Sequence, residues 1–231
     1  MAKFRRALIV GAGSGLSASL ARKFAAEGLE VALASRNPDK LAALCGEIGA
    51  SSFAVDAADP DEVAGLFEAL DVSVGTPDVV VYNASFRTRG PFETLEPAEV
   101  AKTLAVTAYG AFLVAQQAVR RMLPENHGAV LLTGASAGVK GYKHSAPFAM
   151  GKFALRGMAQ SMARELSPQG IHVAHFVIDG GIRSATRIDP ENNPDSFLDP
   201  AAIADSYWHV LNQPRSAWAW EIELRPWVEN F

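Results

Sequence analysis

The sequence predicts an α/β fold in which a doubly wound parallel sheet of about seven strands is covered by helices on both faces. Short runs rich in Val, Ile and Leu recur along the chain, and a segment with helical spacing follows almost every run. The run at 79–81 is continuously apolar, as in strands that are buried on both faces. Parallel neighbours need crossover connections, and the intervening helices supply them.

The same patterns predict where each element lies. Asp59-Pro60 and Asn37-Pro38 each place a cap residue before a proline, so helices are expected to start there. Strands are expected at 4–10, 30–35, 51–55, 78–83, 129–133, 172–178 and 218–224. Helices are expected at 16–27, from 37 onward, and at 59–70, 97–123, 145–166 and 200–211, with a loop at 189–199. No repeat or linker interrupts this order, so a single domain is predicted over residues 1–231.

Composition and charge exclude several classes of partner. The chain is 49% hydrophobic and 20% charged with a net charge of −4, so no global basic field attracts nucleic acid or anionic lipid. The first apolar run ends at Gly11 and is too short for a membrane span or a signal-peptide core. Cys45 is the single cysteine, which suits a reducing compartment. We expect a soluble cytoplasmic protein with no nucleic-acid or membrane partner, and we assign no metal site.

A glycine-rich turn follows the first predicted strand and opens the first predicted helix. Glycines permit a tight turn and let backbone N–H groups approach a pyrophosphate at a helix N-terminus. An ordinary strand-to-helix turn is the alternative interpretation. We interpret the segment as a nucleotide-binding turn. The residues assigned to it are Gly11, Gly13, Ser14, Gly15 and Leu16.

The end of the second predicted strand indicates which nucleotide would bind. Dinucleotide sites often place an Asp or Glu there for the ribose hydroxyl. This chain has Ser35-Arg36 instead, and the planar guanidinium of Arg36 can pair with a 2′-phosphate. A solvated arginine on a loop is the alternative. We therefore expect NADP, with NAD as the less favoured cofactor, and contacts from Ser35 and Arg36.

Four segments in order resemble the short-chain dehydrogenase/reductase family over essentially the whole chain. They are the glycine turn, Val55-Asp56, Val81-Tyr82-Asn83-Ala84-Ser85 and Asp179-Gly180-Gly181-Ile182-Arg183-Ser184. Departures from the family pattern are Ser17, Tyr82, Ser85 and Asp179. The resemblance implies a Rossmann-type NAD(P)-binding domain. Further cofactor contacts that it implies are Asp56, Ala57, Asn83, Ala84, Gly180 and Ile182.

The resemblance also implies hydride transfer between a nicotinamide and a carbonyl or alcohol. In the family a Tyr donates the proton, a Ser holds the oxygen, a Lys binds ribose and an Asn orders a water relay. Lys152 matches the lysine, but the tyrosine position is Phe148, which has no proton to give. The serine position falls on Ala135 and the asparagine position on Thr107. A divergent branch of the family, with Phe for Tyr and the Lys kept, resembles this chain closely.

Two of these residues keep alternative interpretations. Lys152 is expected to bind ribose through its ammonium group, whereas most helical lysines are solvated surface charges. For Phe148, core or interface packing is the alternative interpretation. Among substitute proton donors Tyr142 is favoured, because Lys143 and Lys152 would depress its pKa. The other substitutes considered are Ser136, His144 and Tyr109.

Two functions remain open from the sequence. One is an NADP(H)-dependent oxidoreductase that reduces a small carbonyl or enoyl substrate with a non-standard proton donor. The other is a catalytically impaired nucleotide-binding protein that acts as a sensor or subunit partner. Arg87 and Arg89 could meet an anionic substrate, although solvated loop arginines are the more favoured interpretation.

The quaternary structure is implied by resemblance alone. In the family the two long helices pair between subunits, so a homodimer or homotetramer is expected. Trp218, Trp220 and Trp227 alternate as in a strand and could form a subunit interface, and ordinary core packing explains them equally well.

Overall fold

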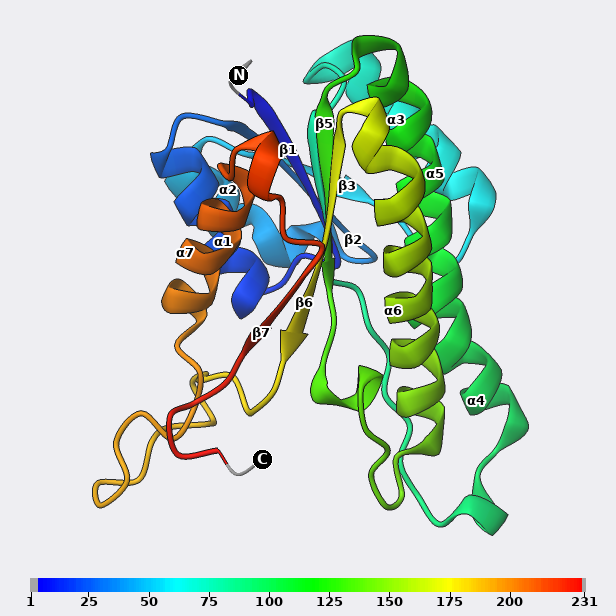
Figure 1. Ribbon diagram of the computed structural model, residues 1–231, viewed down its shortest axis with the longest axis vertical. Coiled ribbons are helices and arrows are strands. Elements are labelled where there is room, and N and C mark those ends of the chain that lie inside the picture. Colours follow the sequence, from blue (N-terminus) through cyan, green and yellow to red (C-terminus); the bar gives the residue numbers. More distant parts are fainter. Residues whose placement is uncertain (1–3, 230–231) are drawn as a thin grey trace.

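The computed structural model describes residues 4–229, which form a seven-stranded parallel sheet between two layers of helices (Figure 1). The strands are β1 (Arg6–Val10), β2 (Glu30–Ser35), β3 (Ser51–Ala54), β4 (Val79–Tyr82), β5 (Gly128–Thr133), β6 (Ile171–Ile178) and β7 (Glu221–Leu224). Their order is β3-β2-β1-β4-β5-β6-β7, and every pairing is parallel. The predicted fold class is confirmed. The predicted domain 1–231 includes residues 1–3 and 230–231, which lie outside the described residues.

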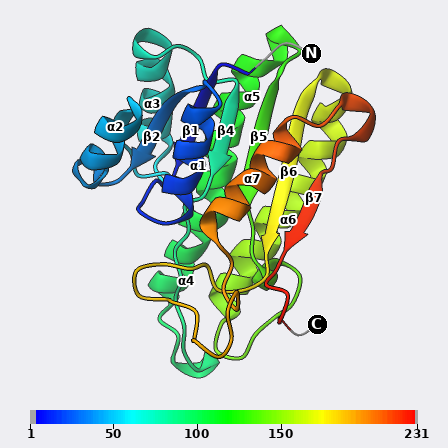
Figure 2. The same ribbon diagram turned by 90° about the vertical axis from the view of Figure 1, so that its left-hand side faces the viewer.

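The helices divide between the two faces of the sheet (Figures 1 and 2). One face carries α1 (Leu16–Ala26), α2 (Ala42–Ile48) and α7 (Pro200–Leu211). The other carries α3 (Pro60–Ser73), α4 (Pro97–Leu104), α5 (Gly110–Met122) and α6 (Ala146–Leu166). This division is what a right-handed crossover after each parallel strand produces when the strand order reverses beside β1.

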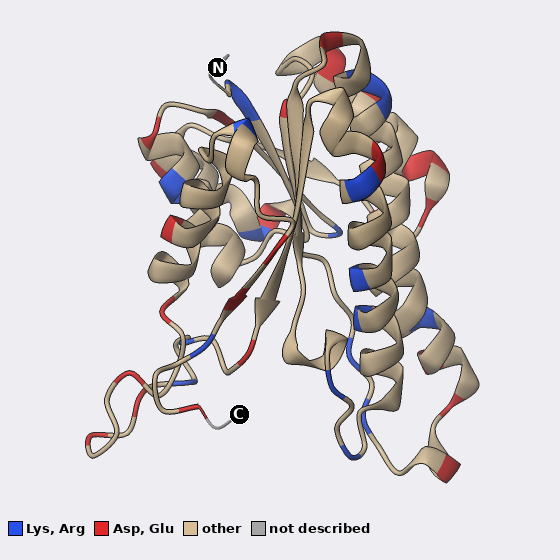
Figure 3. Ribbon diagram, viewed as in Figure 1, with Lys and Arg blue, Asp and Glu red and all other residues tan. Residues whose placement is uncertain are grey.

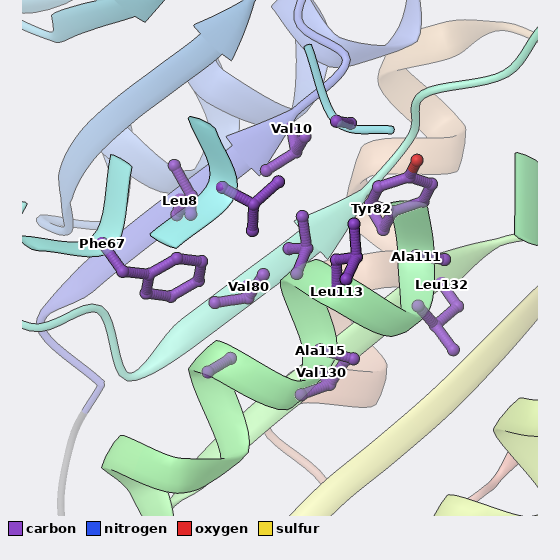
Figure 4. Packing of buried hydrophobic residues seen from close by; sticks show 14 of the residues in the cluster. Leu8, Val10, Phe67, Val80, Tyr82, Ala111, Leu113, Ala115, Val130 and Leu132 are labelled. Carbon is purple, nitrogen blue, oxygen red and sulfur yellow. The ribbon is translucent and has the colours of Figure 1, made fainter. Parts of the chain in front are cut away.

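Alternate residues of each strand build two separate cores. In β1, Leu8 and Val10 join the apolar cluster under α3, α5 and α6, while Ala7 and Ile9 join the cluster under α1 and α7. Figure 4 shows the first cluster, where Phe67 of α3 and Val80 of β4 pack near Leu8. Because both faces are covered, the central strand β4 is buried at every position, which explains the continuous apolar run at 79–81.

One of the two predicted helix caps is correct and the other is wrong. The Asp59 carboxylate accepts hydrogen bonds from the N–H groups of Asp61 and Glu62 at 2.9 and 3.0 Å, so it caps α3. Asn37 makes no such bond, because its proline leads into a 3₁₀ turn at Pro38–Leu41 and α2 begins only afterwards. Most other boundaries differ from prediction by a few residues, as is usual at element ends.

The helix predicted at 97–123 is one continuous helical stretch interrupted by a π-helical turn at Ala105–Tyr109. The turn is in contact with the ends of β3 and β4. The Tyr82 hydroxyl donates a hydrogen bond to the Val106 carbonyl at 2.5 Å. Gly110 follows, and a Cβ there would lie 2.5 Å from both the Ala57 carbonyl oxygen and the Tyr82 hydroxyl. Only glycine allows this approach.

This stretch, Pro97–Glu125, is also long and apolar enough to cross a membrane by length and composition. Its apolar side packs in the core: Ala111, Val114 and Ala118 of α5 are fully buried against the sheet. It is therefore a core helix of a soluble fold.

The strand predicted at 218–224 begins only at Glu221, so the strand-like alternation of tryptophans is wrong. Trp218 and Trp220 precede β7, and Trp227 follows it. The Trp218 ring stacks on His172 with centroids 4.5 Å apart, whereas Trp227 is 78% exposed. The Ala219 N–H donates a hydrogen bond to Gln213 Oε1 at 2.8 Å, and the Ala219 carbonyl oxygen is hydrogen-bonded to His172 Nε2 at 3.0 Å, so side chains hold this segment where the strand was expected.

Candidate active site

A single groove runs along the carboxyl ends of the strands. A cavity of about 590 Å³ follows β1, β2 and β3, and a cavity of about 1020 Å³ follows β5 and β6. Asn83 and Ser85, which come directly after β4, line both cavities and join them. The groove thus crosses the boundary between β1 and β4, where the strand order reverses and ligands of such sheets bind.

The glycine turn forms one wall of the smaller cavity. Gly11 has a φ of +83°, and a Cβ there would lie 2.3 Å from the Ala84 backbone nitrogen, so only glycine fits. Gly11, Gly13 and Ser14 line the cavity as predicted. Gly15 and Leu16 are not among its lining residues. Gly15 is the residue before α1, and Leu16 is buried in the core with an exposed fraction of 5%.

Ser17 braces this turn from behind. It is 2% exposed, its hydroxyl donates a hydrogen bond to the Gly11 carbonyl at 3.0 Å, and it accepts one from the Asn83 side-chain amide at 2.7 Å. The chain Gly11–Ser17–Asn83 ties the end of β1 to the end of β4. A glycine at position 17 could make neither bond.

The far end of the smaller cavity is lined from β2 and β3. Ser35 and Arg36 follow β2, and Asp56 and Ala57 follow β3, as predicted. Lys40 lies in the 3₁₀ turn four residues after Arg36 and adds a second cation that sequence reasoning missed. A lysine in the turn directly after the strand was the available signal. Arg36 and Lys40 line the cavity and Asp39 between them does not, which suits a phosphate group.

The larger cavity places an aromatic ring between two cations. The Phe148 ring centroid is 4.7 Å from the Arg87 guanidinium carbon and 5.7 Å from Lys152 Nζ. Both distances are within the range of cation–π attraction. Phe148, Arg87 and Lys152 all line the cavity. Phe148 is therefore part of the cavity wall, and packing is not its whole role.

Lys152 is buried, so the alternative interpretation of this residue as a solvated surface lysine is wrong. It is 3% exposed, and its ammonium donates a hydrogen bond to the Thr133 carbonyl at 2.7 Å, at the end of β5. Burial lowers the pKa of Lys152 to about 8. Its position on the inner side of α6 aims the group at the cavity, where ammonium donors remain free for a ligand.

The loop after β6 closes one side of the larger cavity. Gly180 and Ile182 line it as predicted. Arg183 pairs with three aspartates of the following loop: Asp189 at 2.6 Å, Asp195 at 3.3 Å and Asp199 at 3.2 Å. Arg187 from the same loop also lines the cavity, although no motif in the sequence marked it.

Comparison with known proteins decides the family. A family model described as short chain dehydrogenase matches residues 5–195. This chain belongs to the short-chain dehydrogenase family. A short-chain dehydrogenase from Rhodopseudomonas palustris, known from its crystal structure, is 35% identical with a TM-score of 0.84, covering 96% of this chain and 99% of that one.

Two further relatives are similar over nearly their whole length. A metagenomic short-chain oxidoreductase in complex with NADP is 26% identical with a TM-score of 0.83, covering 96% of this chain and 97% of that one. An uncharacterized oxidoreductase from Staphylococcus aureus (strain N315) is 27% identical over 226 residues, 95% of this chain and 96% of that one. The resemblance to the family is thus confirmed, while the divergent branch stays a prediction.

The short-chain dehydrogenase positions predicted for catalysis come together only in part. Ala135, Phe148 and Lys152 line the larger cavity. Thr107 does not: it is fully buried in the π-helical turn, its hydroxyl lies 3.4 Å from both the N–H and the carbonyl oxygen of Phe86, and its side chain packs on Gly151.

Among the substitute donors, Ser136, Tyr142 and His144 line the larger cavity and Tyr109 does not. Tyr109 is 49% exposed and its ring lies beside Phe112 on the outer surface, so its predicted place at the cleft is wrong. The lysine found in contact with Tyr142 is Lys140, with Nζ 5.7 Å from the ring centroid. A hydrogen bond with Tyr142 raises the pKa of Lys140.

Proposed function

We propose that this short-chain dehydrogenase binds NADP(H) and transfers hydride between the nicotinamide and a small carbonyl or enoyl substrate. The observation that carries the proposal is the continuous groove, which joins the glycine turn at one end to buried Lys152 at the other through Asn83 and Ser85. The two cavities together span the boundary between β1 and β4, as a dinucleotide site in such a sheet requires.

The groove fits a dinucleotide at each part. The turn at Gly11 has no room for a Cβ and brings backbone N–H groups to a helix N-terminus, which suits the pyrophosphate. Lys152 would hold the nicotinamide-side ribose. Arg36 and Lys40 favour NADP over NAD, because both cations can pair with the 2′-phosphate. When bound, the nicotinamide supplies or accepts the hydride.

The proton must come from this chain's own residues. A carbonyl oxygen that gains negative charge needs a donor, and Phe148 has none. Tyr142 carries a phenolic proton, lines the same cavity and contacts Lys140, so we propose it as the donor, with Ser136 as the second candidate. Reduction of an activated alkene would depend less on this acid.

The competing function is nucleotide binding without turnover, as in a sensor or a subunit partner. It is favoured by one specific observation: Phe148, Ala135 and Thr107 together lack the side chains on which the family's chemistry depends. Thermal unfolding with NADPH, NADH and no ligand, followed by a panel of carbonyl and enoyl compounds, separates the two. Stabilisation by NADPH with turnover supports the reductase, stabilisation without any turnover supports the alternative, and no stabilisation contradicts both.

We also propose that the chain is cytoplasmic and forms a homodimer or homotetramer through α5 and α6. The support is a row of large apolar side chains on the outer side of these helices and the π-helical turn. Tyr109, Phe112, Met150 and Phe153 are each between 44% and 49% exposed. Light scattering after size exclusion tests the assembly, and a monomer at micromolar concentration would contradict it. Cys45, a free cysteine, is compatible with a reducing compartment.

A further inference from the structure

The larger cavity is strongly cationic although the chain as a whole is anionic. Two carboxylates line it, Asp179 and Glu229. Five cationic side chains line it: Arg87, Arg89, Lys143, Lys152 and Arg187. The net charge of the chain is −4, so this excess of positive charge is local. Figure 3 shows the blue Lys and Arg positions on the loops beyond the lower ends of the strands.

Three arginines from two distant loops converge on this cavity. Arg87 and Arg89 follow β4, and Arg187 belongs to the loop after β6. Burial lowers the pKa of Arg87, and the charges of Arg89 and Arg187 lower it further. Because all three side chains line the same cavity, their guanidinium groups repel one another, and an anion between them would relieve this repulsion.

Two of these arginines are held in place by contacts that do not neutralise their positive charge. Arg87 stacks over the Phe148 ring, and Arg187 donates a hydrogen bond to the Ile182 carbonyl at 3.1 Å. Between residues 4 and 229, no ion pair joins Arg87, Arg89 or Arg187 to a carboxylate. Arg183, four residues before Arg187, has three aspartate partners and is neutralised.

One of the two carboxylates of the cavity, Asp179, is already paired with other cations. Asp179 Oδ2 lies 3.6 Å from Lys140 Nζ and 3.4 Å from the Arg225 guanidinium, and it is 4% exposed in its side chain. It therefore does little to neutralise Arg87 or Arg187. Planar guanidinium groups bind carboxylate and phosphate oxygens through paired N–H donors.

We propose that the substrate carries a carboxylate or phosphate group, and that Arg87 and Arg187 bind this anion with Arg89 at the rim. The proposal rests on the larger cavity being the substrate site of the proposed function. Phe148 has a definite part in it: its ring is the platform that orients Arg87. A tyrosine hydroxyl is not needed for this role.

The test is calorimetric titration of the full-length protein with benzoate, its neutral isostere benzamide, and inorganic phosphate, at constant ionic strength. The variants are Arg87→Met and Arg187→Met. Arg120→Met serves as a matched control, because Arg120 is exposed on α5 and lines neither cavity of the groove. Each protein is first shown to be folded by its unfolding temperature, and Arg187→Lys provides a variant that keeps the charge.

We expect at least one anion to bind, benzamide to bind at least about tenfold more weakly than benzoate, and each arginine variant to weaken the bound anion about tenfold. Tighter binding of benzoate indicates a carboxylate substrate, and tighter binding of phosphate indicates a phosphate ester. Equal affinity for benzoate and benzamide, no anion binding, or an equal effect of Arg120→Met would overturn the proposal.

Two further measurements distinguish a failure of this proposal from a failure of the proposed function. Phosphate binding that Arg36→Met weakens and Arg187→Met does not would place the anion in the smaller cavity and overturn the proposal. The titrations are run with and without saturating NADP⁺. If NADP⁺ fails to bind, the proposed function falls, while the anion titrations without nucleotide still decide the charge preference of the larger cavity.

Discussion

The two ends of the groove are built from different parts of the chain. The smaller cavity is shaped by backbone: a glycine turn, the ends of β1, β2 and β3, and a serine strut behind them. The larger cavity is shaped by side chains on loops and on α6. A site made of backbone tolerates many sequences as long as the turn closes. A site made of side chains changes its chemistry with a single replacement, as Phe148 illustrates.

The largest expected effect comes from placing a proton donor at position 148 in the larger cavity. In a chain whose proposed donor is removed by Tyr142→Phe, Phe148→Tyr with Ala135→Ser should raise carbonyl reduction by about a hundred- to ten-thousand-fold, the usual contribution of general acid catalysis. The measurement is NADPH oxidation with a panel of ketones and aldehydes. Phe148→Leu with Ala135→Ser is the control, since it changes packing without supplying a hydroxyl. An unchanged rate in the tyrosine variant would mean that the larger cavity differs from the family in more than its acid.

Lys152 links the two ends, and its removal tests whether they act as one site. Lys152→Met should weaken NADPH binding by about ten- to a hundredfold, because charge-assisted hydrogen bonds to the ribose are lost. Fluorescence titration of NADPH measures it. Lys143→Met is the control, because Lys143 lines the same cavity but is exposed. Equal losses in both variants would point to general electrostatics.

The lowered pKa of Lys152 adds a pH signature to this variant. Since burial sets this pKa at about 8, the ammonium loses its proton above that pH, and the wild-type affinity for NADPH should fall between pH 7 and 9. In Lys152→Met the fall should disappear. Without ligand the sign reverses: the unfolded chain binds more protons between about pH 8 and 10.5, so deprotonation makes wild type more stable relative to Lys152→Met as pH rises.

Replacing Arg36 tests the smaller cavity, where we propose that this side chain favours NADPH over NADH. Arg36→Met should weaken NADPH binding about tenfold and leave NADH binding unchanged, because only NADPH carries the 2′-phosphate. Thermal shifts with each nucleotide check this. Lys40→Met is the companion variant, with a smaller effect expected from a single-point charge. A wild-type shift that is larger with NADH than with NADPH would refute the role of Arg36.

The smallest expected effect comes from Ser17, which supports the glycine turn of the smaller cavity. Ser17→Ala should lower the free energy of unfolding by about 1–2 kcal/mol, because the Asn83 amide and the Gly11 carbonyl lose a buried partner. Urea unfolding measures the change. Ser19→Ala, two residues along α1, is the control. If both variants are equally stable, the hydrogen bonds of Ser17 do not stabilise the glycine turn.

Sequence reasoning found the fold and the nucleotide end because both depend on local patterns. Apolar runs marked the strands, and the glycine turn marked the wall that Gly11 and Ala84 form. The resemblance to the family also put Lys152 and Phe148 in one cavity. What it missed depends on folding in three dimensions: Arg187 lies in a loop without a motif, and Lys140, which contacts Tyr142, took the place expected for Lys143.

The errors have a common physical origin. Patterns along the chain predict a cap at Asn37 and a strand through Trp218 and Trp220, and tertiary contacts decide otherwise. A proline-led 3₁₀ turn replaced the cap at Asn37. Stacking on His172 holds Trp218 outside the strand. The direction of Tyr109 follows from the π-helical turn, which no local pattern announced.

The π-helical turn also sets the orientation of α5, the helix that follows it. A π-helical turn holds about one residue more than an α-helical turn, so the helix beyond it is rotated by about 100° relative to an uninterrupted one. The face of α5 that meets the sheet and the face that carries Phe112 are therefore set at Ala105–Tyr109. Deleting one residue there would turn every side chain of α5 by about 100° around the helix axis, so this short segment sets which side chains of α5 lie on the subunit surface.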